Sequence, residues 1–199
     1  MGRADAVGAF GAASRWAWAV AVAAGLARIA YVVAGVLSPD PDDFDCDSSW
    51  DYGANAVDAV AFLLTAAAVL GLHARQRHRS GTLGRVGAIA AAVGCAAAGV
   101  NNPVEHCGGV AVLGIVLWVP ATLLLLGGHL LLGAATIRAR VLPAWAGAAL
   151  LVGVLALFVA FNTGGAAVYG IAWVAVGAAL RATGEPQPER GGETLLPPA

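Results

Sequence analysis

Three side chains of this sequence could act as an acid, a base or a hydrogen-bonding ligand within an apolar environment. Asp58 is flanked by apolar residues, and Glu105 and His106 are neighbours in a short polar stretch that follows Pro103. A histidine titrates near neutral pH, and burial moves a glutamate toward the same range. We therefore take Asp58, Glu105 and His106 as candidate catalytic residues for acid–base chemistry. The alternative for Glu105 and His106 is that polar residues at the outer ends of helices only cap those ends.

Arg28 is the only basic residue that lies inside a long apolar run. A charge inside a membrane is expected to be paired or functional. Arg28 lies nine residues before Leu37, about 14 Å along a helix, and its side chain can recover about 6 Å, which leaves its charge roughly 8 Å below the boundary. Asp58 lies five residues after Gly53, about 7.5 Å below the same boundary. The matching depths predict an Arg28–Asp58 ion pair. Separate satisfaction by backbone carbonyls, asparagines or water is the alternative.

The three cysteines divide into two classes. Cys46 and Cys107 lie in polar stretches, whereas Cys95 lies within an apolar run. Disulfides persist outside the cytoplasm, so two cysteines in loops on that side predict a Cys46–Cys107 bond. No Cys-x-x-Cys spacing is present to tune a reactive thiolate, so a structural staple is favoured over a redox pair. Cys95 is interpreted as a small packing residue.

An acidic run, residues 40–52, supplies the one candidate metal site. Asp43, Asp45 and Asp47 alternate as calcium ligands do, which makes a divalent cation the one candidate cofactor. The run lacks the glycine and the closing glutamate of an EF-hand loop. A solvated acidic surface is therefore the alternative interpretation. No other cofactor is identified.

The composition indicates a membrane protein. The chain is 59% hydrophobic and 12% charged, about half the charge of an average soluble domain. A lipid bilayer is thus its expected partner, and a small apolar or lipid molecule is a candidate ligand. No basic face with interleaved aromatic residues suggests a nucleic-acid partner. All eleven basic residues are arginine, which together with abundant alanine and glycine is typical of a high-GC bacterium.

Apolar stretches predict an all-α, polytopic membrane helical bundle with six transmembrane helices. Each stretch approaches the roughly 20 residues that a crossing requires. A short segment, 1–15, precedes the six-helix domain, 16–180, and a Pro-, Gly- and Glu-rich tail, 181–199, is predicted to be disordered. An acidic loop, 38–52, joins the first two helices. The predicted spans are 16–37, 53–72, 86–100, 109–132, 144–161 and 166–180.

The arginines orient the bundle. With six spans, both termini and the two basic loops lie on one side, and that side receives ten arginines while the other loops receive none. An excess of arginine in short loops marks the cytoplasmic side. We therefore predict a multi-pass protein of the plasma membrane with both termini in the cytoplasm. The ten are Arg3, Arg15, Arg75, Arg77, Arg79, Arg85, Arg138, Arg140, Arg181 and Arg190.

Polar residues gather toward the predicted outer side, where they would line a pocket around Arg28. They are Asn55, Asn101, Asn102 and Asn162. The inner half of the bundle holds fewer, chiefly Thr65, His73 and His129, the last interpreted as a helix-contact residue. The sequence therefore predicts a disulfide-capped, outward-facing polar pocket that binds a small ligand, cation or partner. One alternative is a small intramembrane enzyme for a lipid or isoprenoid-like substrate, and another is a transporter or channel.

Overall fold

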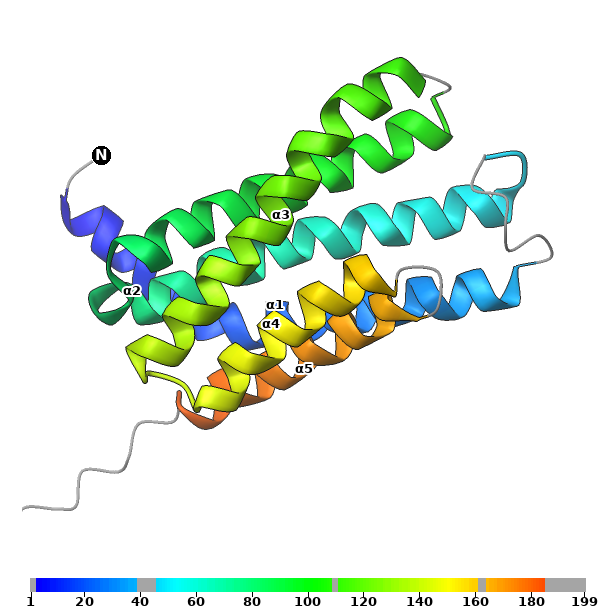
Figure 1. Cartoon of the computed structure of the whole chain (residues 1–199). Coiled ribbons are helices and arrows are strands. Elements are labelled where there is room, and N and C mark those ends of the chain that lie inside the picture. The colour runs from blue at the N-terminus through cyan, green and yellow to red at the C-terminus, as the bar shows by residue number, and fades with distance from the viewer. Residues whose placement is uncertain (1–2, 39–45, 109–110, 161–163, 185–199) are drawn as a thin grey trace, which may run out of the picture.

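The protein is a bundle of helices. The computed structural model describes residues 3–38, 46–108, 111–160 and 164–184, and within these ranges every regular element is α-helical. Four stretches are long and apolar enough to cross a membrane, and Ala144–Val159 is apolar but shorter. The helices are α1 (Arg3–Leu37), α2 (Ser49–His106), α3 (Ala111–Ala139), α4 (Ala144–Val159) and α5 (Gly165–Ala182) (Figure 1).

Helix α2 is a hairpin rather than one rod. Gly81 has φ 60° and ψ −161°, a backbone conformation that essentially only glycine adopts. The chain reverses there, and the two halves of α2, cyan and green in Figure 1, run back along each other. Asn55 and Asn102, 47 residues apart, are hydrogen-bonded between these halves. The basic stretch predicted as a loop, 73–85, is thus helical on both sides of one glycine.

The polar stretch around Pro103, which separates the third and fourth predicted spans, is helical rather than a turn. Helix α2 continues through Asn102 and Pro103 to His106. Proline removes one backbone donor, but in the last turn of a helix this interrupts little of the hydrogen-bond ladder. The N–H of Cys107 donates to the Pro103 carbonyl at 3.0 Å and closes that turn.

The acidic loop is shorter than the predicted 38–52, because α2 already begins at Ser49. Ser48 is its N-cap, and the Ser48 hydroxyl accepts from the Asp51 backbone N–H at 3.3 Å. The Asp51 carboxylate in turn accepts from the Ser48 N–H at 2.9 Å. This reciprocal capping box gives hydrogen-bond partners to two backbone N–H groups that would otherwise lack them, so Asp51 stabilises the start of α2.

The helical segments alternate in direction, which creates two chemically different ends (Figure 1). The start of α1, the Gly81 turn, the α3–α4 link and the end of α5 gather at what we call the arginine end. Exposed arginines mark it, namely Arg77, Arg79, Arg85, Arg138 and Arg181. The opposite end, called the disulfide end, holds Cys46 and Cys107.

Small residues allow the second half of α2 to approach α3 closely. A Cβ atom added to Gly128 would overlap the backbone nitrogen of Ala91, and one added to Gly94 would overlap that of Leu125. Without a hydrophobic force between helices in lipid, such backbone proximity supplies the packing energy. The abundant Ala and Gly therefore determine how near the helices lie.

We expect Gly128→Ala to destabilise the fold by about 1–3 kcal/mol, because α2 and α3 must separate to admit the methyl group. Gly127→Ala is the matched control, since a Cβ there meets nothing within 4 Å. Unfolding midpoints in mixed detergent micelles of increasing dodecyl sulfate content measure both. Equal midpoints for the two variants would contradict the close α2–α3 crossing.

Candidate functional site

A buried ion pair lies between α1 and the first half of α2, toward the disulfide end. Nη1 of Arg28 donates to Oδ1 of Asp58, and the side chains are only 1% and 6% exposed. The predicted Arg28–Asp58 pair is thereby confirmed. The Asn102 amide donates to the other Asp58 oxygen at 3.0 Å and to the Asn55 carbonyl oxygen at 3.1 Å. Both carboxylate oxygens therefore have a donor.

Aromatic rings complete the surroundings of the Arg28 guanidinium. Its carbon Cζ lies 3.9 Å from the centroid of the Phe62 ring and 5.7 Å from that of Tyr31. Nε and Nη2 of Arg28 have no hydrogen-bond partner among the described residues. The cation is thus held by one carboxylate and by attraction to ring faces, which is strongest where water is excluded.

The disulfide end is tied to this network. Cys46 and Cys107 are bonded, as predicted, with Cα atoms 4.8 Å apart and a sequence separation of 61. The Cys46 N–H also donates to the His106 carbonyl at 3.4 Å. The Asn55 amide donates to the Asp51 carbonyl at 3.0 Å and lies 3.5 Å from the Cys46 sulfur. Asn55 therefore connects the disulfide to the partners of Asp58.

A polar chamber of about 240 Å³ adjoins the ion pair. The three candidate catalytic residues, Asp58, Glu105 and His106, all line it, together with Asn102. Asn101 lies behind Glu105 and donates to its carboxylate at 3.1 Å. The remaining lining residues are the aromatic Tyr31, Phe62 and Trp118.

The remaining candidates are Asn162 and the three aspartates of the acidic run. Asn162, Asp43 and Asp45 fall outside the described residues, and Asp47 is exposed. Among the residues that the structure describes, no three His, Cys, Asp or Glu side chains are grouped so as to hold a metal ion.

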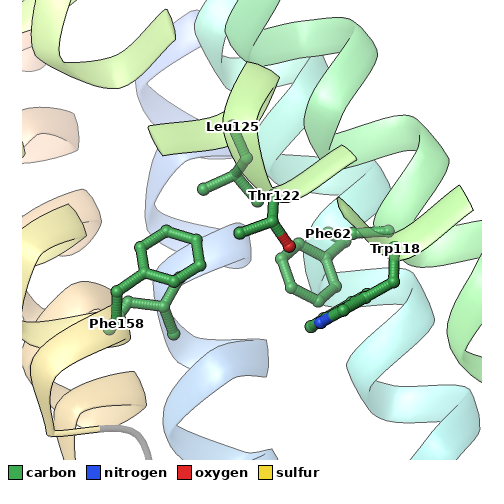
Figure 2. A pocket seen from close by; sticks show the side chains of 7 residues that line it. Phe62, Trp118, Thr122, Leu125 and Phe158 are labelled. Carbon is green, nitrogen blue, oxygen red and sulfur yellow. The ribbon is translucent and has the colours of Figure 1, made fainter. Parts of the chain in front are cut away.

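A second, apolar chamber of about 280 Å³ lies between α2, α3 and α4 (Figure 2). It shares Phe62 and Trp118 with the polar chamber. Phe158 faces these residues from α4 (Figure 2). No feature of the sequence predicts this chamber, because nothing in an apolar span distinguishes a lining residue from a lipid-facing one. The other lining residues are Ala98, Thr122, Leu125 and Leu157.

Further buried polar contacts join neighbouring helices. The Gln76 amide donates to the Thr136 hydroxyl at 3.0 Å. Nδ1 of His129 lies 2.8 Å from the Leu125 carbonyl, which can only accept, so Nδ1 carries the proton. Nε2 then accepts from the Tyr169 hydroxyl at 2.7 Å. His129 is therefore a contact between α3 and α5, in agreement with its interpretation from sequence.

Comparisons of the chain with protein-family models, with curated proteins and with solved structures find no match. The function is therefore inferred from the chemistry of the two chambers. Two carboxylates and an imidazole line the polar chamber, with a guanidinium behind one carboxylate. This set can accept hydrogen bonds, bind a cation or exchange a proton.

Proposed function

We propose that the protein crosses the plasma membrane of a high-GC bacterium six times and binds a small ligand, cation or partner in the polar chamber. Both termini would lie in the cytoplasm, with 1–15 and 181–199 flanking the membrane domain, and the disulfide end would lie outside. The observation that carries this proposal is the polar chamber near the Cys46–Cys107 disulfide, lined by two carboxylates and an imidazole. A concave site with a few convergent polar groups is the usual form of a ligand site.

The two ends of the bundle support this orientation. Exposed arginines gather at one end, as the cytoplasmic side of a membrane protein requires. The disulfide lies at the other end, which supports a location outside the cytoplasm, because disulfides persist in an oxidising compartment. The two halves of α2 provide two crossings and α1, α3, α4 and α5 one each. Helix α4 has 16 residues, about 24 Å of helix, so the bilayer would thin locally around it.

An acid–base enzyme for a lipid or isoprenoid-like substrate is the second candidate. It is favoured by the convergence of Asp58, Glu105 and His106 on one chamber that adjoins an apolar one. A proton-transfer residue must lie within hydrogen-bond reach of the reacting atom. The two candidates share one site and differ in whether the bound molecule is changed.

Cysteine labelling tests both the orientation and the chamber. In a Cys95→Ala background, we expect Ser49→Cys, at the exposed disulfide end, to react with a membrane-impermeant maleimide on intact cells. Arg79→Cys, exposed at the arginine end, should react only after permeabilisation. The reverse pattern would contradict the orientation.

A third variant, Tyr31→Cys, reports on the chamber that this residue lines. We expect it to react from outside, more slowly than Ser49→Cys because it is partly buried. Tetramethylammonium, guanidinium, calcium and acetate ions are then tested for protection. Slower labelling of Tyr31→Cys but not of Ser49→Cys by any of them supports binding in the chamber. No protection by any of the four would contradict it.

A further inference from the structure

We propose that the two chambers together bind one single-chain amphiphile, with a cationic headgroup in the polar chamber and an alkyl chain in the apolar chamber. The inference rests on the proposed function and names the class of ligand. It is carried by the adjacency of the two chambers, by the chemistry of the apolar one and by the carboxylates and aromatic rings that line the polar one.

The chambers are adjacent, because Phe62 and Trp118 line both of them. The apolar part extends along α3 from Trp118 to Leu125, seven residues or about 10 Å of helix. Figure 2 shows Phe62 and Trp118 side by side, with Phe158 opposite. The two volumes together fall within the roughly 300–1,000 Å³ of ordinary ligand sites.

The apolar chamber has the chemistry of a site for a hydrocarbon chain. Of its lining side chains only Thr122 and Trp118 carry a polar atom, and the Thr122 hydroxyl has no hydrogen-bond partner among the described residues. An empty cavity of this size destabilises a protein in proportion to its volume, whereas a bound chain restores the lost contacts. Trp118 is 37% exposed, so the chamber reaches the lipid-facing surface. A chain can therefore enter from the bilayer without crossing water.

The charges around the polar chamber favour a cation. Asp58 is neutralised by Arg28, whereas Glu105 is a second carboxylate whose described hydrogen bond comes from the neutral Asn101. Both carboxylates line the chamber, whereas Arg28 is not among the lining residues, so a headgroup in the chamber meets carboxylate oxygens. These oxygens attract a cationic headgroup rather than an anionic one.

The aromatic wall favours the same headgroup. Tyr31, Phe62 and Trp118 line the chamber, and ring faces attract ammonium groups. Arg28 shows that this wall accepts a cation, since its guanidinium already lies against Phe62. An alkylammonium or quaternary ammonium amphiphile satisfies the carboxylate and the rings together.

Photoaffinity labelling in nanodiscs tests the inference. The lipid is digalactosyl diacylglycerol, whose uncharged headgroup does not compete, and the probe is dodecyltrimethylammonium with a diazirine in its chain. We expect saturable labelling of the peptides that contain Thr122, Leu125, Leu157 and Phe158, read by mass spectrometry. Unlabelled dodecyltrimethylammonium should suppress it at a concentration at least tenfold lower than dodecyl sulfate.

Two variants and one control test the site of the alkyl chain and the site of the headgroup separately. Thr122→Trp places an indole in the apolar chamber and should reduce labelling at least fivefold. Leu123→Trp adds the same group at a 65% exposed position and should leave labelling unchanged. Glu105→Gln should bring the tenfold preference for the cation close to one, because it removes a carboxylate that the headgroup contacts. The headgroup competition uses the unaltered chain, so it stands even where a variant fails to fold.

Equal suppression by the cationic and anionic amphiphiles, or non-saturable labelling equal to that of lipid-facing Leu123, would overturn the inference. If tetramethylammonium protects Tyr31→Cys while the probe fails to label the apolar chamber saturably, the polar site stands and the amphiphile does not. If neither the ions nor the probe bind, both proposals fall.

Discussion

Replacing Asp58 with leucine is expected to lower the free energy of unfolding by about 3–5 kcal/mol, because it leaves a buried cation without its carboxylate. Arg28 is 1% exposed, and an arginine cannot release its proton to become neutral. The remaining contacts, with Phe62 and Tyr31, cannot replace the ion pair. The unfolding midpoint in mixed dodecyl sulfate micelles measures the loss.

The reverse substitution, Arg28→Leu, should cost less than Asp58→Leu. The Asp58 carboxylate keeps the Asn102 donor, and a carboxylate in an apolar site can bind a proton. The double variant should recover most of the loss, since two apolar side chains replace a buried pair at little cost. Asp47→Asn, at an exposed position, is the control and should stay within about 0.5 kcal/mol of the unaltered chain. Single variants as stable as the unaltered chain would contradict a structural role for the pair.

Removing the disulfide is expected to cost about 2–4 kcal/mol, since it releases a long closed loop in the unfolded chain. The bond joins residues 61 positions apart and holds the start of α2 against its end. Cys46→Ser and Cys107→Ser should therefore lower the unfolding midpoint by similar amounts. Adding a reductant should do the same to the unaltered chain.

Two cysteine variants serve as controls for this prediction. A reductant should have no further effect on Cys46→Ser, because the bond is already absent. Cys95→Ala should remain sensitive to the reductant, since Cys95 is a free, buried thiol. An unaltered chain that resists the reductant completely, while free-thiol titration shows the bond reduced, would show that the staple contributes no stability.

Several features of this protein could be predicted from its sequence, because each depends on hydropathy or charge summed over a segment of the chain. Mean hydropathy and span length predict apolar helices, and the positions of the arginines predict which segment ends share a side. The Arg28–Asp58 pair follows from depth alone, because two charges at one level of a bundle have few other partners. The Cys46–Cys107 bond follows similarly, as the two polar cysteines lie at one end.

Only the tertiary structure decides which apolar side chains form the chamber. In a bilayer, residues such as Phe62 and Leu63 are equally apolar whether they face the core or the lipid, so periodicity does not separate the two faces. The helical path through Asn102 and Pro103 and the reversal at Gly81 depend likewise on contacts between segments distant in sequence. The preference of a segment for lipid or water depends on its own residues, whereas the shape of a cavity depends on how the helices pack against one another.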